Sequence, residues 1–322
     1  MKILYCDYKL PVLSEDASER FRELLPGCEI ECCQYVDDEL LIKKLKNADG
    51  LLTAHLKINQ YVLDRAQKLK VISVDATGYG NIDTKAAKSN GIIVCSIGAY
   101  CTQEVADHGM MLILMLEKKV KKYMKLVEES YIYNYRELEP EHQIEGKRLA
   151  VFGLGRIGKA LAARAKAFGY EVVAVPHDES KIGLREDGIL YVSGKEAFHT
   201  ADVISNNMSE TADNFEFFNK EAFREMKKHP IFINLGRGST VNEADLYQAL
   251  KNNELSGAGL DVMKDVYPDL STNPLVGLDN VIITPHMAFY SVESMKKISQ
   301  IPVMNLINAL TGKYEEIANI CR

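Results

Sequence analysis

The sequence has no apolar run long enough to cross a membrane. The longest, MMLILML at 110–116, is far short of the roughly twenty residues that a transmembrane helix needs. The opening residues, MKILYCD, predict a first β-strand rather than a signal peptide. The sequence therefore argues against a membrane protein, and we expect a cytoplasmic one.

The sequence also lacks the cysteine and charge patterns of several protein classes. Its 7 cysteines are an odd number with no C-x-x-C spacing, and Cys32 and Cys33 are adjacent. This pattern fits neither a disulfide framework nor a zinc site, and we expect no bound metal. A formal net charge of -6 argues against a general nucleic-acid-binding protein.

What the sequence does contain is an alternation of short β-branched runs with longer helical stretches, typical of parallel sheets with crossover helices. The runs form two sets. The first set is 2–7, 29–33, 50–54, 71–75 and 92–95, and the second is 148–153, 171–175, 189–192, 202–206, 231–234, 257–262 and 281–284. The chain is about twice the usual domain size, so we expect two α/β domains.

Two long helices and one irregular segment complete the pattern. A helix is expected over about 103–128, with Thr102 as its N-cap and an apolar middle packed between the domains. A last helix is expected from about Ser291 to Leu310. The segment 126–146, rich in Tyr and Glu, is interpreted as an arm used in dimer contacts.

A glycine-rich loop follows the first strand of the second set. Gly153, Gly155 and Gly158 have G-x-G-x-x-G spacing between an apolar strand and an Ala-rich helix, which is typical of dinucleotide binding. Gly153 allows the turn, Gly155 lets the backbone approach the pyrophosphate, and Gly158 lets helix and strand pack closely. The helix N-terminus favours phosphate, and Arg156 in the loop can add a charge-assisted contact.

The acidic partner of the adenosine ribose is expected about twenty residues beyond such a loop. Pro176 occupies that position here, and Asp178 follows two residues later. Asp178 either binds the ribose or forms a turn. Lys181 and Arg185 are close enough in sequence to meet a 2′-phosphate, so both NAD and NADP remain open as the cofactor.

Three later segments carry a family resemblance. They are INLGRGSTVNEADL (233–246), GAGLDVMKDVYP (257–268) and NVIITPHMAFYS (280–291), supported by GYGNIDTKAA (78–87) and AYCTQEVADHGMMLIL (99–114). Together they resemble the D-2-hydroxyacid dehydrogenase family, closest in appearance to its D-lactate dehydrogenase branch. The resemblance covers nearly the whole chain.

The resemblance implies two Rossmann-like, flavodoxin-like parallel-sheet domains with an interdomain cleft. The substrate domain would comprise 1–100 and 289–322, and the dinucleotide-binding domain 101–288. The implied activity is NAD(P)-dependent reduction of a small 2-oxo acid to the (R)-hydroxy acid by a homodimer, without nucleic-acid or membrane partners.

The resemblance also assigns roles to individual residues. Arg237 would orient the substrate and polarise its carbonyl group, since a guanidinium suits both tasks. His286 would carry the proton, because histidine is the side chain that ordinarily exchanges protons near neutral pH. Substrate contacts are expected at Ala76, Thr77, Gly78, Tyr100 and Tyr290, and further cofactor contacts at Ile157, Asn207, Leu235, Gly236 and Asp261.

One position departs from the family pattern. The family has a glutamate five residues after the strand-end aspartate, where it hydrogen-bonds the histidine, and that position here is Val266. Either Asp265 takes over this role or the carboxylate is absent. Asp75, directly before Ala76, is a second departure. The loss of the glutamate, together with Ser96–Gly98 where the family has Asn-x-Pro at the domain crossing, leaves an alternative, a dinucleotide-sensing or corepressor-like protein with weak or no turnover.

Overall fold

The computed structural model describes residues 1–321, and these residues form two compact units. One unit contains Met1–Tyr100 and the chain from Ser291 onward, and the other contains Cys101–Tyr290. The second boundary lies two residues later than the sequence predicted. Each unit is built on its own parallel sheet.

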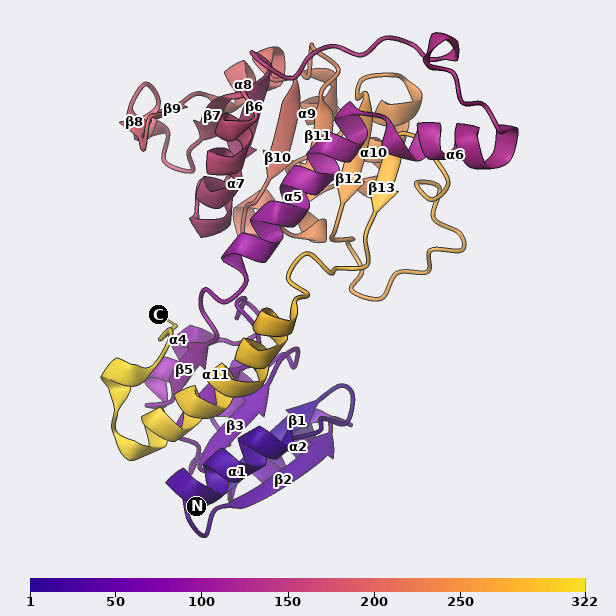
Figure 1. Cartoon of the computed structure of the whole chain (residues 1–322). Helices are drawn as coiled ribbons and strands as arrows, with labels where there is room; N and C mark the ends of the chain where they lie inside the picture. Colours follow the sequence, from indigo (N-terminus) through magenta and orange to yellow (C-terminus); the bar gives the residue numbers. More distant parts are fainter. Residues whose placement is uncertain (322) are drawn as a thin grey trace. The chain divides into compact units, whose positions relative to one another are not determined.

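The first unit is a five-stranded parallel sheet in the order β2-β1-β3-β4-β5 (Figure 1). Apolar clusters cover both faces, one around Leu4, Leu51 and Ile72 and the other around Ile3, Phe21 and Leu306. Its strands are β1 (Lys2–Asp7), β2 (Glu29–Gln34), β3 (Gly50–Thr53), β4 (Val71–Val74) and β5 (Ile93–Ser96). Its helices are α1 (Glu15–Leu24), α2 (Asp38–Leu45), α3 (Gln60–Leu63), α4 (Thr84–Ser89) and α11 (Val292–Thr311).

The second unit is an eight-stranded sheet in the order β13-β12-β11-β10-β6-β7-β9-β8, parallel except at β8 (Figure 1). With β6 as first strand, its centre has the order typical of dinucleotide-binding sheets. The strands are β6 (Arg148–Phe152), β7 (Glu171–Val175), β8 (Arg185–Glu186), β9 (Ile189–Tyr191), β10 (Val203–Asn206), β11 (Ile231–Asn234), β12 (Gly257–Leu260) and β13 (Val281–Ile283). The helices are α5 (Thr102–Glu117), α6 (Val120–Ser130), α7 (Arg156–Ala167), α8 (Gly194–Thr200), α9 (Lys220–Arg224) and α10 (Glu243–Lys251). Both predicted strand sets are present, and the α/β fold class is confirmed.

The prediction of one long helix over 103–128 was wrong in two respects. The helix is broken between α5 and α6, where Lys119 adopts a left-handed φ of 46°. The apolar pattern continues across this break, so the sequence did not show it. Thr102 is the first helical residue rather than the N-cap, which is Cys101.

The segment 126–146 was likewise only partly irregular, because α6 continues to Ser130.

Strand β8 was missed because it is only two residues long. It pairs antiparallel with β9 through a two-residue turn, Asp187 and Gly188, both with positive φ. Asp-Gly is a strong hairpin signal that could have predicted this turn. Within the described residues, no helix is both long and apolar enough to cross a membrane.

Asp75 is an unusual carboxyl group at the end of β4. Its Oδ2 accepts a hydrogen bond from the Tyr5 hydroxyl at 3.1 Å, whereas its buried Oδ1 has no hydrogen-bond partner. Burial raises the pKa of Asp75 to about 7, and the nearby Asp7 carboxylate adds to the rise. The Tyr5 hydrogen bond opposes this rise without cancelling it. The fold therefore favours the protonated form.

We expect Asp75→Asn to become more stable than the wild type as pH rises. Below about pH 4 the wild-type carboxyl is protonated in both the folded and the unfolded chain. Between about pH 4 and 7 the unfolded chain ionises first, so the wild type loses at most about 4 kcal/mol of unfolding free energy. Urea unfolding of both proteins at about pH 4.5 and about pH 8 measures this change.

The matched control is Tyr5→Phe, which keeps the carboxyl and removes the hydrogen bond to it. Because that bond favours the ionised form, this variant should retain the pH dependence or enlarge it. An equal stability difference between Asp75→Asn and wild type at both pH values would contradict the prediction.

Candidate active site

The glycine loop between β6 and α7 has three positions with different surroundings. Gly153 has a φ of 89°, and a Cβ there would lie 2.9 Å from the Asn207 backbone. A Cβ on Gly158 would lie 2.3 Å from the Gly153 carbonyl oxygen. A Cβ on Gly155 would meet nothing within 4 Å. The fold thus requires glycine at positions 153 and 158. Gly155 instead borders open space into which a ligand can fit.

Two further features of this loop suit a dinucleotide. Gly155 is the N-cap of α7 and supplies no side-chain cap, so the first N–H groups of the helix face the loop. Arg156 is exposed beside them, and Ile157 is half-buried. At the end of the neighbouring β10, the buried Asn207 Oδ1 has no hydrogen-bond partner, as suits an acceptor for a ribose hydroxyl. The residues present therefore fit the predicted cofactor.

Asp178 lies after β7 and caps a short 3₁₀ turn. It is exposed, and its Oδ1 accepts a hydrogen bond from the Ser180 N–H at 3.0 Å. Hydrogen bonds from Ser180 hold the pKa of Asp178 below its usual value. The hydrogen bond from Ser180 thus supports the interpretation of Asp178 as a turn-forming residue. Its role in binding the ribose stays a prediction.

A buried polar network fixes the loop that carries Arg237. The Asn206 Nδ2 group donates to Asn234 Oδ1 at 2.9 Å and to Thr240 Oγ1 at 2.8 Å. The Thr240 hydroxyl donates to the Arg237 carbonyl oxygen at 2.7 Å, and the Gly236 N–H donates to Asn234 Oδ1 at 3.1 Å. These bonds tie the ends of β10 and β11 to the loop that follows β11 and carries Arg237.

The side chains on this loop have different surroundings. The Arg237 guanidinium is exposed and donates to the Gly236 carbonyl oxygen at 2.9 Å. Leu235 is buried, and a Cβ on Gly109 of α5 would lie 2.4 Å from it. Gly236 lies against the Met208 backbone, where a side chain would not fit. Arg237 is thus the exposed charged group on a rigid loop.

A second network holds the segment that carries His286. The Asp261 carboxylate, 3% exposed, accepts hydrogen bonds from the Thr284 hydroxyl at 2.7 Å and from the N–H groups of Met287 at 2.9 Å and Ala288 at 3.0 Å. His286, between these contacts, is exposed with a left-handed φ of 51°. Its ring meets Phe289 edge-on at 6.0 Å.

Asp261 was predicted to contact the cofactor. Its carboxylate has about four acceptor positions, and three of them are used by the His286 segment. One position on Oδ2 is therefore available for an amide of the cofactor. Holding the His286 segment is a role that the sequence did not indicate.

Sequence reasoning also gave no site role to Thr284 or His108. The His108 Nε2 atom lies 2.9 Å from Thr284 Oγ1 and 3.5 Å from Asp261 Oδ1. The AYCTQEVADHGMMLIL segment matched the family around His108, and that match was the available signal. Asp265, by contrast, is exposed beside Lys264, in a run of exposed residues that includes Val266 and Tyr267.

The predicted substrate residues of the first unit lie at the ends of β4 and β5. Thr77 Oγ1 donates to the Gly98 carbonyl oxygen at 2.9 Å, and the Ile97 N–H donates to the Ala76 carbonyl oxygen at 3.2 Å. Among the described residues, nothing accepts a hydrogen bond from the N–H groups of Ala76, Thr77 or Gly78. Three available N–H groups in one turn suit an anion.

Two tyrosines remain from the predicted substrate residues. The Tyr100 carbonyl oxygen, in the first unit, accepts a hydrogen bond from Lys297 at 3.2 Å. Tyr290 belongs to the second unit, and its side chain is 66% exposed and meets Phe289 edge-on at 6.3 Å. Their substrate contacts stay predictions.

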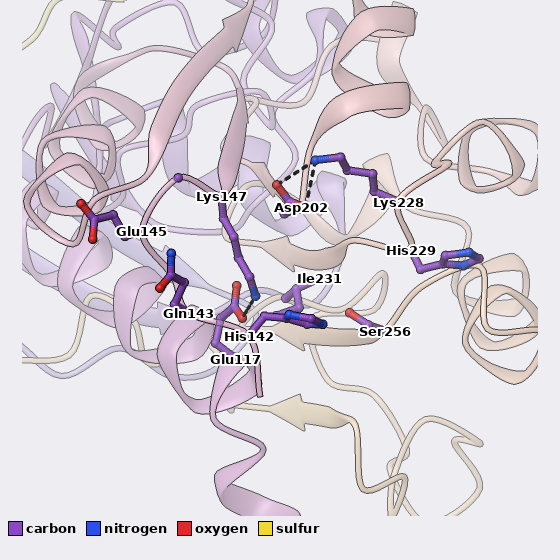
Figure 2. Close-up of a pocket in the computed structure, with 11 residues that line it drawn as sticks. Glu117, His142, Gln143, Glu145, Lys147, Asp202, Lys228, His229, Ile231 and Ser256 are labelled. Carbon is purple, nitrogen blue, oxygen red and sulfur yellow. Dashed lines mark hydrogen bonds and ion pairs between the residues drawn. The ribbon is translucent and has the colours of Figure 1, made fainter. Parts of the chain in front are cut away.

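A polar pocket of about 560 Å³ is shown in Figure 2. It lies at the amino ends of strands of the second sheet, whereas the glycine loop lies at the carboxyl end of β6. Its lining residues Lys147, Asp202, Ile231 and Ser256 stand at the amino ends of the strands, away from the glycine loop. Its charges are largely paired with one another, Lys228 with Asp202 at 3.1 Å and Lys147 with Glu117. This pocket is therefore separate from the predicted cofactor and substrate residues. No cluster of three or more potential metal ligands occurs in residues 1–321.

Comparison with known proteins identifies the family. Residues 110–288 match the family described as D-isomer specific 2-hydroxyacid dehydrogenase, NAD binding domain. The chain belongs to this family. It is therefore an oxidoreductase with NAD as cofactor, and the residues that match the family's NAD-binding domain lie within the second unit.

Individual relatives agree with this assignment. The chain is 30% identical to a glyoxylate reductase of Korarchaeum cryptofilum over 85% of this chain and 83% of the relative. It resembles D-lactate dehydrogenase from Aquifex aeolicus, solved with NAD and lactic acid, with 28% identity, a TM-score of 0.83 and coverage of 99% and 98%. It also resembles an acyclic imino acid reductase, solved with NADPH and D-Arg, with 27% identity, a TM-score of 0.85 and full coverage of both chains.

We expect Gly155→Ala and Gly158→Ala to fail in different ways. Gly155→Ala adds a methyl group to open space, so the melting temperature should stay near that of the wild type while NAD binding weakens at least roughly tenfold. Gly158→Ala forces a contact with the Gly153 carbonyl, so it should unfold at lower temperature. Thermal unfolding and NADH fluorescence titration measure both effects. Unchanged NAD affinity in Gly155→Ala would exclude pyrophosphate approach at this position.

Proposed function

We propose that this protein reduces a 2-oxo acid to the (R)-2-hydroxy acid, with Arg237 orienting the substrate and His286 donating the proton. The observation that carries the proposal is that both residues follow strands of one sheet on either side of β12. Arg237 follows β11 and His286 follows β13. Ligands of such sheets bind at the carboxyl ends of the strands.

The reaction divides between cofactor and side chains. Reduced NAD supplies the hydride that C2 of the substrate accepts. The Arg237 guanidinium can pair with the substrate carboxylate and polarise the C2 carbonyl. Protonated His286 gives its proton to the developing alkoxide, so the products are the hydroxy acid and NAD, and the imidazole regains a proton from water. In the first unit, the N–H groups of Ala76, Thr77 and Gly78 suit a carboxylate.

We further propose NAD rather than NADP as the preferred cofactor. A carboxylate at the end of the second strand repels a 2′-phosphate, and exposed Asp178 stands close to that position. Lys181 is directed toward the Tyr191 ring, with its Nζ 5.9 Å from the ring centroid. Arg185 donates to the Gly188 carbonyl oxygen at 3.4 Å. Both cations thus have other contacts.

A second candidate is reduction of a 2-imino acid that carries a positive charge. Asp75 favours it, because its unpartnered Oδ1 can accept a hydrogen bond from an ammonium or guanidinium group. The likeness to the acyclic imino acid reductase solved with D-Arg points the same way. The dinucleotide-sensing alternative has no support from the comparisons, whose relatives are named as dehydrogenases and reductases.

The direct test is a substrate panel with NADH and NADPH. We expect NADH oxidation with at least one of pyruvate, phenylpyruvate, 2-oxoisocaproate, glyoxylate and hydroxypyruvate. His286→Ala should lower kcat by roughly 10² to 10⁴ because it removes the proton donor. Turnover that needs added ammonia and a basic 2-oxo acid would favour the imino acid reaction. Absence of turnover with every substrate and both cofactors would overturn the proposal.

The same assay tests Asp265. An exposed carboxylate interacts only weakly with a neighbouring charge, so Asp265→Asn should leave the pH profile of kcat/KM close to that of the wild type. A downward shift of the pH above which reduction fails would instead identify Asp265 as the carboxylate that supports His286.

We also propose a homodimer that uses the segment after α5. Three tyrosines of this segment, Tyr131, Tyr133 and Tyr135, are 87%, 97% and 76% exposed. Large exposed aromatic side chains in one segment are typical of an interface. Sedimentation equilibrium should give about twice the chain mass of 36.1 kDa. Replacing all three tyrosines with serine should weaken the dimer, and a monomeric wild type would contradict this proposal.

A further inference from the structure

The strongest unassigned group near the site is His108 in α5. Its side chain is only 9% exposed, and its Nε2 atom lies 2.9 Å from Thr284 Oγ1. Burial lowers the pKa of His108, although the Asp261 carboxylate opposes this shift. At neutral pH the imidazole is therefore uncharged, with one nitrogen that donates and one that accepts.

The hydrogen-bond pattern decides which nitrogen carries the proton. Thr284 has one hydroxyl hydrogen, and it is donated to Asp261 Oδ1 at 2.7 Å. The Thr284 oxygen can then only accept from His108, so Nε2 carries the hydrogen. The result is a directed chain, from His108 to Thr284 to Asp261.

This chain ends on the backbone around His286. Asp261 accepts from the N–H groups of Met287 and Ala288, the two residues that follow His286. His286 has a φ of 51°, a conformation that costs free energy for a residue other than glycine and persists only where its surroundings fix it. The Asp261 carboxylate supplies this constraint, and His108 and Thr284 fix the carboxylate in turn.

Helix α5 is a suitable anchor for the chain. It packs against α7, β11 and β12. Next to His108, Gly109 lies so close to Leu235 that a Cβ would be 2.4 Å from that side chain and 3.4 Å from Leu161 of α7. The position of His108 is therefore set by the helix that follows the glycine loop and by the Arg237 loop.

We infer that His108 is a positioning residue that holds His286 in its working conformation through Thr284 and Asp261. This inference rests on the proposed function, in which His286 donates the proton. His108 does not touch the substrate in this scheme. Its effect is on the backbone of residues 284–288.

The first measurement is hydrogen exchange, which does not depend on turnover. In the wild type, the N–H groups of Met287 and Ala288 should exchange slowly. His108→Leu removes the donor and keeps an apolar side chain, so these amides should exchange roughly tenfold faster or more. His108→Gln places an amide donor near the same position and should restore most of the protection.

The second measurement is steady-state kinetics with a 2-oxo acid that the panel shows to be turned over. His108→Leu should lower kcat roughly tenfold or more through misplacement of His286, with the KM for NADH changed less than about threefold. His108→Gln should recover most of kcat. A residue that only packs α5 would change stability without rescue by glutamine.

The third measurement tests the chain itself. Thr284→Val keeps the shape of the side chain and breaks both hydrogen bonds of the hydroxyl. Because His108 acts through Thr284, adding His108→Leu to Thr284→Val should lower kcat little further, within about twofold. Multiplicative losses would overturn the inference. If His108→Leu is poorly folded, Thr284→Val with hydrogen exchange gives the same test.

The outcomes separate this inference from the proposed function. A wild type without turnover overturns the proposed function, while faster exchange in His108→Leu with rescue in His108→Gln still supports the positioning role. An active wild type, combined with unchanged exchange and unchanged kcat in His108→Leu, overturns the positioning role alone.

Discussion

The segment that carries His286 depends on one carboxylate, that of Asp261. It stands at the end of β12, between the strands that lead to Arg237 and His286, and it is almost completely buried. A buried charge without partners would be very costly, and this one is stabilised by two N–H groups and a hydroxyl of the His286 segment. The same contacts that stabilise the buried charge also hold the backbone around His286.

The neighbouring strand ends use neutral groups for the same purpose. The amides of Asn206 and Asn234 and the hydroxyl of Thr240 are buried. The Asn206 amide donates to Asn234 and Thr240, and the Thr240 hydroxyl donates to the Arg237 carbonyl oxygen. Such a network is rigid because any displacement leaves a buried polar group unsatisfied. Arg237 extends into solvent from this rigid base, so its charge is available while its backbone is fixed.

Much of this organisation could be predicted from the sequence, because it depends on patterns of neighbouring residues. The strands are apolar runs, and the roles of Gly153, Gly155 and Gly158 follow from their spacing. Thr284, His108 and Asn206 could not be assigned in this way. Their partners are distant in sequence, 176 residues in the case of His108 and Thr284, and a single polar residue gives no periodic signal. The break at Lys119 was hidden for a related reason, since the apolar pattern continues through it.

The contacts of Asp261 also define a closed loop of chain. Asp261 directly follows β12, Thr284 directly follows β13, and Met287 and Ala288 come shortly after it, so residues 262–280 leave and return to the same place. Changing the length of a flexible loop between fixed ends alters its closure entropy only slowly. A change in the length of the exposed run from Lys264 to Tyr267 would therefore cost little closure entropy. The His286 segment is held at the ends of β12 and β13 through Asp261, whereas Val266 and Tyr267 in the intervening loop are exposed.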